Sequence, residues 1–372
     1  MLNTQNSHLS SKAERNNSEY LIHNKGFWAS LPKPFFAMAP MSDVTDSAFR
    51  SIFAKYGKPD ITWTEFVSAD GLFLRPINPP AQIIKDINSR LYIVQQIANK
   101  HCIGIDHPLL YDLIYDELER PIVAQFFSRD TGRMARAASL AHDLGFDGID
   151  INMGCPSDVI CKQGAGAAIM KEPELAKKII KATIKGANGL PVSVKTRIGF
   201  DKNEIETWLP VLLEAHPVAI TIHARTRKEM SKVPAHWDII ARAVEIRNKI
   251  APDVLIIGNG DIASIEEAHA RVAETNCDGV MIGRGIIGNP WFFNKKIKKE
   301  NLSSKDIMQA LLEHTKLFEE QLGDIKSFAI MKKHFKAYLH SISNSKHIIS
   351  ELMEKGNSYK DVEDIANPLL SR

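Results

Sequence analysis

The sequence predicts an α/β fold, a (β/α)8 TIM barrel followed by a C-terminal all-helical domain, in a chain of 372 residues. Short apolar runs alternate with helical patterns, and eight such runs between residues 34 and 293 match the arithmetic of a closed barrel. After residue 293 the apolar runs stop and only helical periodicity remains. An open doubly wound sheet can be drawn from the same units, but eight of them favour closure.

The predicted strands are short and rich in β-branched and aromatic residues, as expected of parallel strands that are buried on both faces. They cover residues 35–40, 61–66, 122–127, 148–154, 192–198, 219–225, 254–260 and 279–285. Helical patterns lie between most of them, at residues 46–56, 131–144, 173–185, 204–215, 237–249 and 264–275. These elements place the barrel at residues 31–298.

Three segments fall outside this alternation. Residues 1–30 begin with a polar stretch that lacks the apolar centre of a signal peptide, so we expect a flexible leader and no export. Residues 73–120 are too long for one helix and its loops and predict an insertion over the barrel rim. Residues 299–372 predict the helical domain, in which three lysines flank Phe335; this pattern is typical of a solvated helix face or of an RNA contact.

The charge, apolar runs and cysteines of the sequence exclude some kinds of binding partner but do not identify one. The net charge of +3, from 47 basic and 44 acidic residues, neither requires nor excludes a nucleic-acid partner. No apolar run reaches the roughly 18–20 residues that a membrane span needs, so we expect no membrane partner. The four cysteines, at positions 102, 155, 161 and 277, lack the paired spacing of a zinc site, which indicates reduced thiols in the cytoplasm and no metal.

The predicted strand at 148–154 ends at Gly154 and is followed at once by Cys155 and Pro156. Proline has no N–H for a β ladder, so the strand cannot continue and Cys155 enters a loop. A thiol just beyond the carboxyl end of a strand lies where parallel α/β folds place their chemistry. A buried structural cysteine is the commoner fate of a lone thiol, so the other strand ends must decide between the two interpretations.

The carboxyl ends of the other strands also have polar side chains, and in a barrel these ends all face one site. The turn Ala-Pro-Met-Ser at 39–42 can present its backbone to a flat ligand. Gln125 has an amide that needs a partner, either loop backbone or the edge of a heterocycle. Lys195 lies in an apolar strand, where an ammonium is costly unless it meets an anion or a ring carbonyl. His223 falls in the same ring of positions, although a satisfied core histidine is the commoner case.

The last two strands are each followed by a glycine motif, Gly-Asn-Gly-Asp at 258–261 and Gly-Arg-Gly at 283–285. Glycine lets backbone N–H groups approach a phosphate, and a following helix N-terminus favours negative charge. Barrels often bind phosphate with the loops after strands seven and eight. Together with the amide, the lysine and the turn, this site suits flavin mononucleotide (FMN). Cys155 then faces the ring as a proton donor for the reduction of an activated C=C or C=O bond.

These segments resemble the tRNA-dihydrouridine synthase family over roughly residues 35–293 and, more weakly, through the helical tail. The resemblance depends on a set of motifs: APMSDVTDSAFR, TEFVSADGL, PIVAQFF, DINMGCPSDVICKQGAGAAIMK, VSVKTRIGFD, TIHART, IGNGDI and GRGIIGNPWFF. It implies an FMN-binding barrel and a helical domain that binds tRNA. The activity it implies is the NADPH-dependent reduction of a specific uridine in tRNA to 5,6-dihydrouridine, an oxidoreductase reaction on a C=C bond.

The resemblance also implies roles for matching positions of this sequence. Cys155 is the expected general acid, which protonates C5 of the uracil while FMN delivers hydride to C6. The expected FMN-binding residues are Pro40, Met41, Ser42, Gln125, Lys195, His223, Asn259, Gly260, Asp261, Gly283 and Arg284. The expected substrate-binding residues are Asn152, Arg197 and Arg225. The uridine must leave the tRNA stack to reach the flavin, which accounts for a second, shape-reading domain.

The sequence departs from the family in one loop. After residues 223–226 the family usually runs to a segment like GKADW, where this chain has Val-Pro-Ala-His-Trp at 233–237. The usual Lys and Asp are absent, and we hypothesise that Arg227 and Lys232 replace their contacts. Two other functions stay open: an FMN barrel of the dihydroorotate dehydrogenase type that acts on a free pyrimidine, and an RNA-binding chaperone without catalysis. We expect a cytoplasmic monomer.

Overall fold

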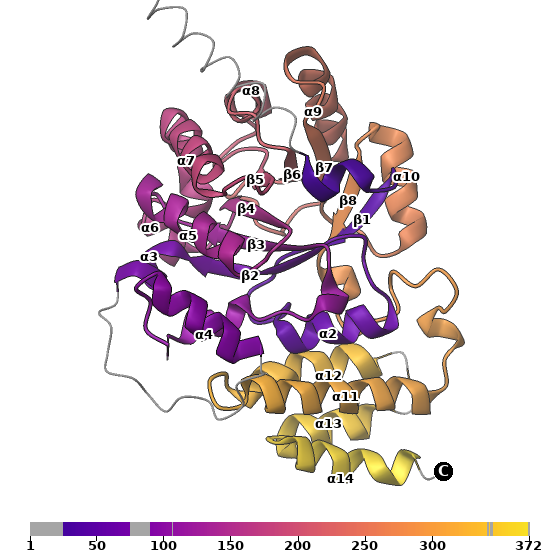
Figure 1. Ribbon diagram of the computed structural model, residues 1–372. Coiled ribbons are helices and arrows are strands. Elements are labelled where there is room, and N and C mark those ends of the chain that lie inside the picture. The colour runs from indigo at the N-terminus through magenta and orange to yellow at the C-terminus, as the bar shows by residue number, and fades with distance from the viewer. Residues whose placement is uncertain (1–24, 75–89, 106, 341, 343–344, 371–372) are drawn as a thin grey trace, which may run out of the picture.

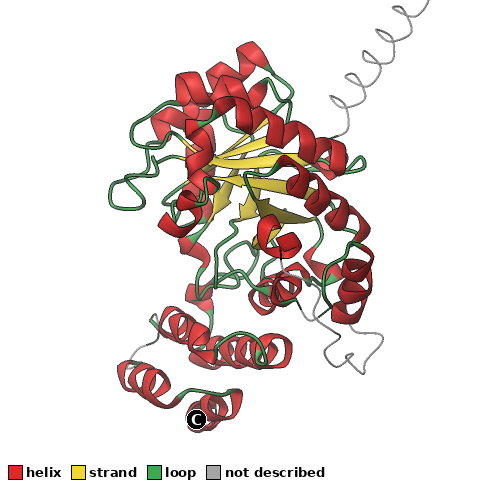
Figure 2. Ribbon diagram, turned by 90° about the vertical axis from the view of Figure 1, so that its left-hand side faces the viewer, coloured by secondary structure: helices red, strands yellow, loops and turns green. Residues whose placement is uncertain are grey.

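Eight parallel strands form the centre of the molecule in the computed structural model, which describes residues 25–74, 90–105, 107–340, 342 and 345–370 (Figure 1). Their order in the sheet is β1-β8-β7-β6-β5-β4-β3-β2. A parallel bridge between Ala37 and Ile61 joins β1 to the residue before β2 and completes the ring. Helices surround the strands, and a further group of helices lies below the barrel (Figure 2). The predicted barrel followed by an all-helical C-terminal region is confirmed.

The strands lie where the apolar runs predict them. They are β1 (Phe35–Met38), β2 (Thr62–Ser68), β3 (Ile122–Phe127), β4 (Gly148–Met153), β5 (Val192–Arg197), β6 (Ala219–His223), β7 (Leu255–Asn259) and β8 (Gly279–Ile282). Every residue of β3, β4, β7 and β8 is buried, which explains why these segments are apolar with few interruptions. Several strands end before their predicted limits, so many of the predicted site residues lie in the loops that follow them.

Helices connect the strands and cover the outside of the ring (Figure 1). They are α2 (Ser47–Tyr56), α3 (Ala69–Leu74), α4 (Arg90–Lys100), α5 (Thr131–Asp143), α6 (Asp158–Lys162), α7 (Pro173–Gly186), α8 (Ile205–Leu213), α9 (Trp237–Ile250) and α10 (Ile265–Thr275). Asp46, Asp130 and Ser264 cap α2, α5 and α10, because each side chain accepts a hydrogen bond from a backbone N–H of the first turn.

Aromatic side chains fill one end of the barrel interior. Trp28, from the short 3-10 helix η1 (Gly26–Ser30), is 3% exposed, and its ring meets those of Phe35 and Trp63 edge-on at centroid distances of 5.9 and 6.0 Å. The assignment of residues 1–30 to a flexible leader is therefore wrong for residues 26–30, because burial of this indole makes them part of the barrel. Residues 1–24 of the predicted leader lie outside the described residues.

The predicted insertion at 73–120 contributes to the barrel core where it is described. After α4 it forms two 3-10 helices, η2 (Pro108–Leu113) and η3 (Glu117–Glu119). Val94, Leu110 and Leu113 are fully buried in the main hydrophobic cluster between strands and helices. This part is the crossover from β2 to β3, and its placement over the rim stays a prediction; residues 75–89 and 106 lie outside the described residues.

The C-terminal helices have an apolar core of their own. They are α11 (Ser304–Leu322), η7 (Phe328–Met331), α12 (Lys332–Leu339), α13 (Lys346–Lys355) and α14 (Tyr359–Leu370). Ala48 and Trp291 of the barrel join this core, and α11 lies beside α2 (Figure 1). Phe335 is fully buried in it, so its ring cannot stack on an RNA base, whereas Lys333 and Lys336 of the same helix are exposed. The exposure of these lysines fits a solvated helix face and an RNA contact equally, so both predictions stay open.

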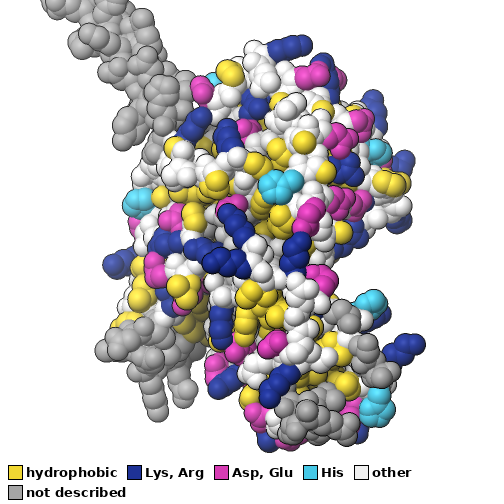
Figure 3. Space-filling model, turned by 90° about the vertical axis from the view of Figure 1, so that its right-hand side faces the viewer, with side chains coloured by type: hydrophobic (Ala, Val, Ile, Leu, Met, Phe, Trp, Pro, Cys, Tyr) yellow, Lys and Arg dark blue, Asp and Glu magenta, His cyan; other side chains and the backbone are white. Residues whose placement is uncertain are grey.

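Charged side chains of both signs are interspersed over the face shown in Figure 3, as the small net charge implies. Many form exposed ion pairs, such as Arg242 with Glu206 and Glu245, and solvent screening leaves such pairs little effect on stability. Within the part of the chain that the structure describes, no helix combines the length and the apolar character needed to cross a membrane.

Candidate active site

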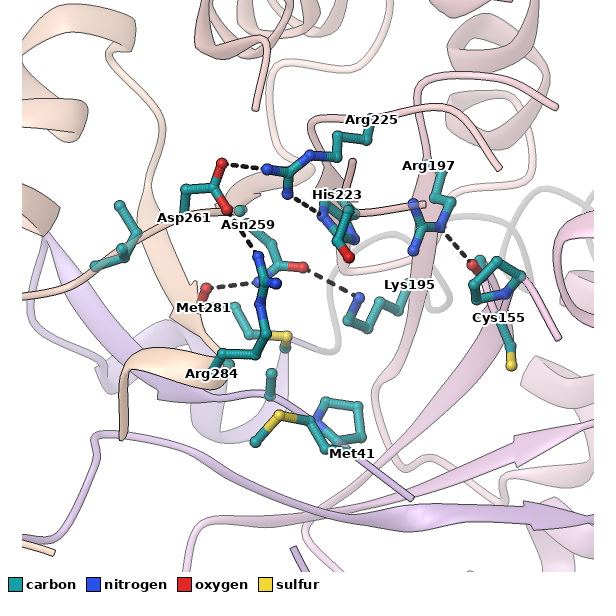
Figure 4. Close-up of a pocket in the computed structure, with 18 of the residues that line it drawn as sticks. Met41, Cys155, Lys195, Arg197, His223, Arg225, Asn259, Asp261, Met281 and Arg284 are labelled. Atoms are coloured by element: carbon teal, nitrogen blue, oxygen red, sulfur yellow. Dashed lines mark hydrogen bonds and ion pairs between the residues drawn. The ribbon is translucent and has the colours of Figure 1, made fainter. Parts of the chain in front are cut away.

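A pocket of about 680 Å³ opens at the carboxyl ends of the strands, a volume typical of small-molecule sites (Figure 4). Most of the predicted site residues meet there. Those that line it are Pro40, Met41, Asn152, Cys155, Lys195, Arg197, His223, Arg225, Asn259, Gly260, Asp261, Gly283 and Arg284. Two predicted residues do not line it: Ser42 is exposed, and Gln125 is fully buried behind Asn152.

Cys155 lies on the side of the pocket opposite Asp261 and Arg284 (Figure 4). The turn at the end of β4 places it there, half-buried in a small apolar cluster with Phe127 and Ile160. Burial raises the pKa of the Cys155 thiol above its usual value, so the group keeps its proton at neutral pH. A general acid must be protonated in this way before its substrate binds.

The side chain of Asn152 fixes the turn in which Cys155 lies. Its Oδ1 accepts hydrogen bonds from Gly154 N at 3.1 Å and from Cys155 N at 2.9 Å. Its Nδ2 donates to Gln125 Oε1 at 3.0 Å. The substrate role expected for Asn152 stays a prediction; in the structure its amide bonds the protein on both sides and positions the thiol.

Asp150 completes this hydrogen-bond network and is a residue that the sequence analysis missed. It is fully buried, and its two oxygens accept from Gln125 Nε2 and Ser193 Oγ, both at 2.6 Å. Burial raises the pKa of Asp150 to about 6, although these hydrogen bonds oppose the rise. A carboxyl group inside an apolar strand is the signal that could have found it, because such a group is costly without partners. Gln125 therefore uses its amide nitrogen to bond Asp150 and its amide oxygen to bond Asn152. The FMN-binding role expected for Gln125 stays a prediction.

Lys195 and His223 occupy the centre of the pocket (Figure 4). Lys195 Nζ donates to Asn259 Oδ1 at 3.3 Å, and burial together with the nearby Arg197 guanidinium lowers the pKa of this lysine to about 8. His223 Nε2 lies 3.2 Å from Arg225 Nη1, and because a guanidinium only donates, this ring nitrogen is the acceptor. Burial and the surrounding cations hold the pKa of His223 well below its usual value, so the ring is neutral.

Asp261 lies between two arginines at the end of the pocket formed by the loops after β7 and β8 (Figure 4). It pairs with Arg225 and with Arg284, whose Nη2 is 2.9 Å from Asp261 Oδ1. Burial opposes ionisation of Asp261, but the hydrogen bond from Arg225 and other contacts outweigh it and lower the pKa. Gly260 has a φ of +136°, and a Cβ there would lie 2.8 Å from Ala235 Cβ, so this position requires glycine. A Cβ on Gly283 would meet no atom closer than 3.6 Å, so the loop after β8 leaves backbone open to a ligand. This cationic end fits a phosphate.

The two arginines expected to bind substrate also hold loops in place. Arg197 Nε donates to Gly154 O at 2.8 Å, and its Nη1 donates to Thr226 O at 3.0 Å. Arg225 Nε donates to Val233 O at 2.6 Å. Both side chains still line the pocket, so their contact with substrate stays a prediction.

The loop that departs from the family pattern places its cations outside the pocket. Arg227 pairs with Asp158, and its guanidinium lies 5.2 Å from the ring centroid of Phe200. Lys232 is exposed, and neither cation lines the pocket, whereas Met230 of the same loop does. The hypothesis that Arg227 and Lys232 replace the usual contacts therefore gains no support from the geometry.

All four cysteines are free thiols, and Cys161 lies beside the catalytic candidate, with its Sγ 3.7 Å from Cys155 O. Over the described ranges, no three His, Cys, Asp or Glu side chains lie close enough together to hold a metal ion.

Comparisons with known proteins give the family. Residues 37–369 match the family model Dihydrouridine synthase (Dus). The "Probable tRNA-dihydrouridine synthase" of Staphylococcus aureus (strain COL) is 35% identical over 331 residues, which are 88% of this chain and 91% of that protein. The "Probable tRNA-dihydrouridine synthase 2" of Bacillus subtilis (strain 168) is 35% identical over 88% of this chain and 92% of that protein. A solved structure, the old yellow enzyme homologue from Zymomonas mobilis, aligns with a TM-score of 0.43 and 15% identity over 71% of this chain and 89% of that chain.

The family match extends over both the barrel and the helical region, and every residue that lines the pocket lies within it. The bacterial relatives are covered over nearly their whole length. The chain belongs to the dihydrouridine synthase family.

Proposed function

We propose that this protein is a cytoplasmic, NADPH-dependent tRNA-dihydrouridine synthase, which reduces a uridine of tRNA to 5,6-dihydrouridine with FMN bound in the pocket. Family membership and the names of the relatives support the reaction and its substrate. The observation that supports it most directly is the pocket itself, in which a protonated thiol faces a cationic end. Reduction of a C=C bond beside a flavin needs a proton donor on one side and an anchor for the cofactor on the other.

The residues of the pocket fit FMN. Its phosphate would meet Arg284 and the two glycine loops that line the pocket, and the loop at Gly283 leaves space beside its backbone. Lys195 has N–H donors left after its bond to Asn259, and these would bond a carbonyl of the ring. When bound, FMN supplies hydride that NADPH renews. The remaining chemistry belongs to the side chains of this protein.

The protein's own residues contribute the proton transfer to this reaction. Cys155 gives its proton to C5 of the uracil when C6 is reduced, so an S–H bond breaks and a C–H bond forms. The thiolate that remains is stabilised by Arg197 and Lys195, whose charges favour the ionised form. The network from Asp150 through Gln125 to Asn152 holds the thiol in place, and a buried network of this kind is rigid when its members are bonded.

The tRNA would be bound by the helical region together with the mouth of the barrel. A uridine inside folded RNA cannot reach a pocket at the carboxyl ends of the strands, so it must be turned out of its stack. Turning out a base requires contacts to the surrounding RNA that compensate for lost stacking, and a second structural unit beside the pocket can provide them.

The test is nucleoside mass spectrometry, mapped by position, of tRNA from cells with and without the gene. We expect one dihydrouridine to disappear and to return with the parent gene but not with a gene encoding Cys155→Ala. The purified variant should keep FMN and lose about 10²–10⁴-fold in turnover, because the acid acts in the chemistry and not in cofactor binding. An unchanged tRNA profile would refute the substrate, and parental turnover by the variant would refute the role of the thiol.

A further inference from the structure

The turn that follows β1, residues 41–45, has a strained residue at its tip. Met41 at its start lines the pocket, and Val44 N and Thr45 N both donate to Met41 O, at 3.1 and 3.0 Å. Asp43 is exposed and has a φ of +54°, in the left-handed region that is disfavoured for a residue with a Cβ. Such a conformation persists only where the surrounding contacts determine it.

The backbone N–H and C=O of Asp43 both bond to groups outside the turn. Its N–H donates to Glu65 Oε1 on β2 in a close contact. Its C=O accepts a hydrogen bond from Lys333 Nζ on α12 at 2.6 Å. Lys333 is 290 residues away along the chain and belongs to the helical region. The strained residue is therefore held from two sides, and one of them is not part of the barrel.

Glu65 is itself bonded to the helical region. It is 4% exposed, and its Oε2 lies 2.5 Å from Nζ of Lys326, which comes from the segment between α11 and η7. Lys326 also pairs with Asp112 Oδ1 at 2.8 Å. Burial raises the pKa of Glu65 to about 7, and the Lys326 ammonium opposes the rise. Without Lys326, two carboxyl groups would share a buried place with no cation between them.

We infer that Lys326 and Lys333 are positioning residues of the cofactor site, through which the helical region holds the turn that presents Pro40 and Met41 to the pocket. The inference depends on the proposed function, in which this turn contacts FMN. It gives the helical region a second role besides binding tRNA, because the barrel alone does not supply all the contacts that fix the turn. A merely structural attachment of the helices would leave FMN affinity unchanged in variants that stay folded.

The first test compares Lys333→Ala with Lys336→Ala, an exposed lysine on the same helix. FMN affinity of the full-length apoprotein is measured by quenching of FMN fluorescence. We expect Lys333→Ala to bind FMN about three- to tenfold more weakly, because it removes a charged donor from Asp43 O, and Lys336→Ala to match the parent. The affinity for tRNA, measured by filter binding, should change equally in the two variants, because each loses one surface charge.

The second test uses the buried pair. Lys326→Met leaves Glu65 and Asp112 without a cation, and we expect FMN to bind about tenfold more weakly or worse, with a lower melting temperature. Adding Glu65→Gln removes one unpaired carboxyl and keeps an oxygen acceptor for Asp43 N, so the double variant should recover part of the affinity.

The outcomes separate this inference from the proposed function. Parental FMN affinity in Lys333→Ala and in a folded Lys326→Met would overturn the inference and leave the proposed function intact. A parent apoprotein that binds no FMN would overturn both. If Lys326→Met does not fold, Lys333→Ala decides alone, because Lys333 is exposed and its replacement leaves no buried group unpaired.

Discussion

Replacing Asn152 by alanine tests whether the placement of the Cys155 thiol, and not only its presence, sets the rate of reduction. The substitution removes two hydrogen bonds accepted from Gly154 N and Cys155 N and one donated to Gln125 Oε1. Each net hydrogen bond contributes about 1 kcal/mol, and a buried group left without a partner costs more. We therefore expect Asn152→Ala to lose about 2–4 kcal/mol of unfolding free energy, measured by urea titration.

The effect on rate has a separate cause. Once the turn after β4 is released, the thiol is no longer fixed relative to the pocket, and a misplacement of about 1 Å can cost about 10²-fold in rate. Single-turnover reduction of tRNA by pre-reduced Asn152→Ala should slow by about this factor. Binding of FMN should be retained, because the cationic end lies on the other side of the pocket.

Asn152→Asp is the matched control, because it keeps an oxygen acceptor for the N–H groups of Gly154 and Cys155 and loses the bond to Gln125. It should keep more of the rate than Asn152→Ala. A parental rate with parental stability in Asn152→Ala would refute the reasoning, since the amide would then not fix the turn. Loss of FMN from that variant would show that the amide acts on the cofactor.

Two further predictions concern stability. His314 and His334 are fully buried, with ring centroids 4.8 Å apart. Burial lowers the pKa of both side chains, that of His334 to about 3. As the pH falls, these histidines therefore bind protons in the unfolded chain at a higher pH than in the folded protein. Their contribution should be complete above about pH 6.5 and decline as the pH falls, by about 1.4 kcal/mol per pH unit for each histidine, and for His334 the decline should end near pH 3. Urea titrations of the parent and His334→Phe across this range check it, and parallel pH curves would contradict it. Trp28→Ala should cost about 3–5 kcal/mol at pH 7 by opening a cavity inside the barrel, with Ser30→Ala as an exposed control; a loss as small as that of the control would show that the indole does not stabilise the barrel.

The strands could be predicted because a parallel strand that is buried on both faces needs apolar side chains at nearly every position. β3 has the limits that the apolar run predicts, and β4 differs by one residue. Trp28 could not be predicted as a barrel residue, because the apolar run around it is too short to show a helical or strand period. The burial of Val94 and Leu110 likewise depends on a surface formed by distant parts of the chain.

The sequence predicted which residues would gather at the pocket, but not the partners of their side chains. Arg197 and Arg225 follow from their positions at strand ends, yet the carbonyls they bond belong to loops whose course no local pattern fixes. Asp150 was missed although its charge inside an apolar run was visible in the sequence. The contact of Lys326 with Glu65 joins residues 261 apart, and no spacing rule reaches that far.

The position of Asp261 has a consequence for which anions the pocket accepts. Its carboxylate is an internal counter-ion for Arg284, whose side chain is 63% exposed. An anion that binds Arg284 must compete with the Asp261 carboxylate. The fold, and not the salt of the medium, sets the effective concentration of this carboxylate. A singly charged anion such as chloride brings no more charge than the carboxylate it would displace. A phosphate monoester carries about 1.5 to 2 negative charges at neutral pH and can attract Arg284 more strongly. If the phosphate of FMN binds here as proposed, this ion pair would favour it over singly charged anions.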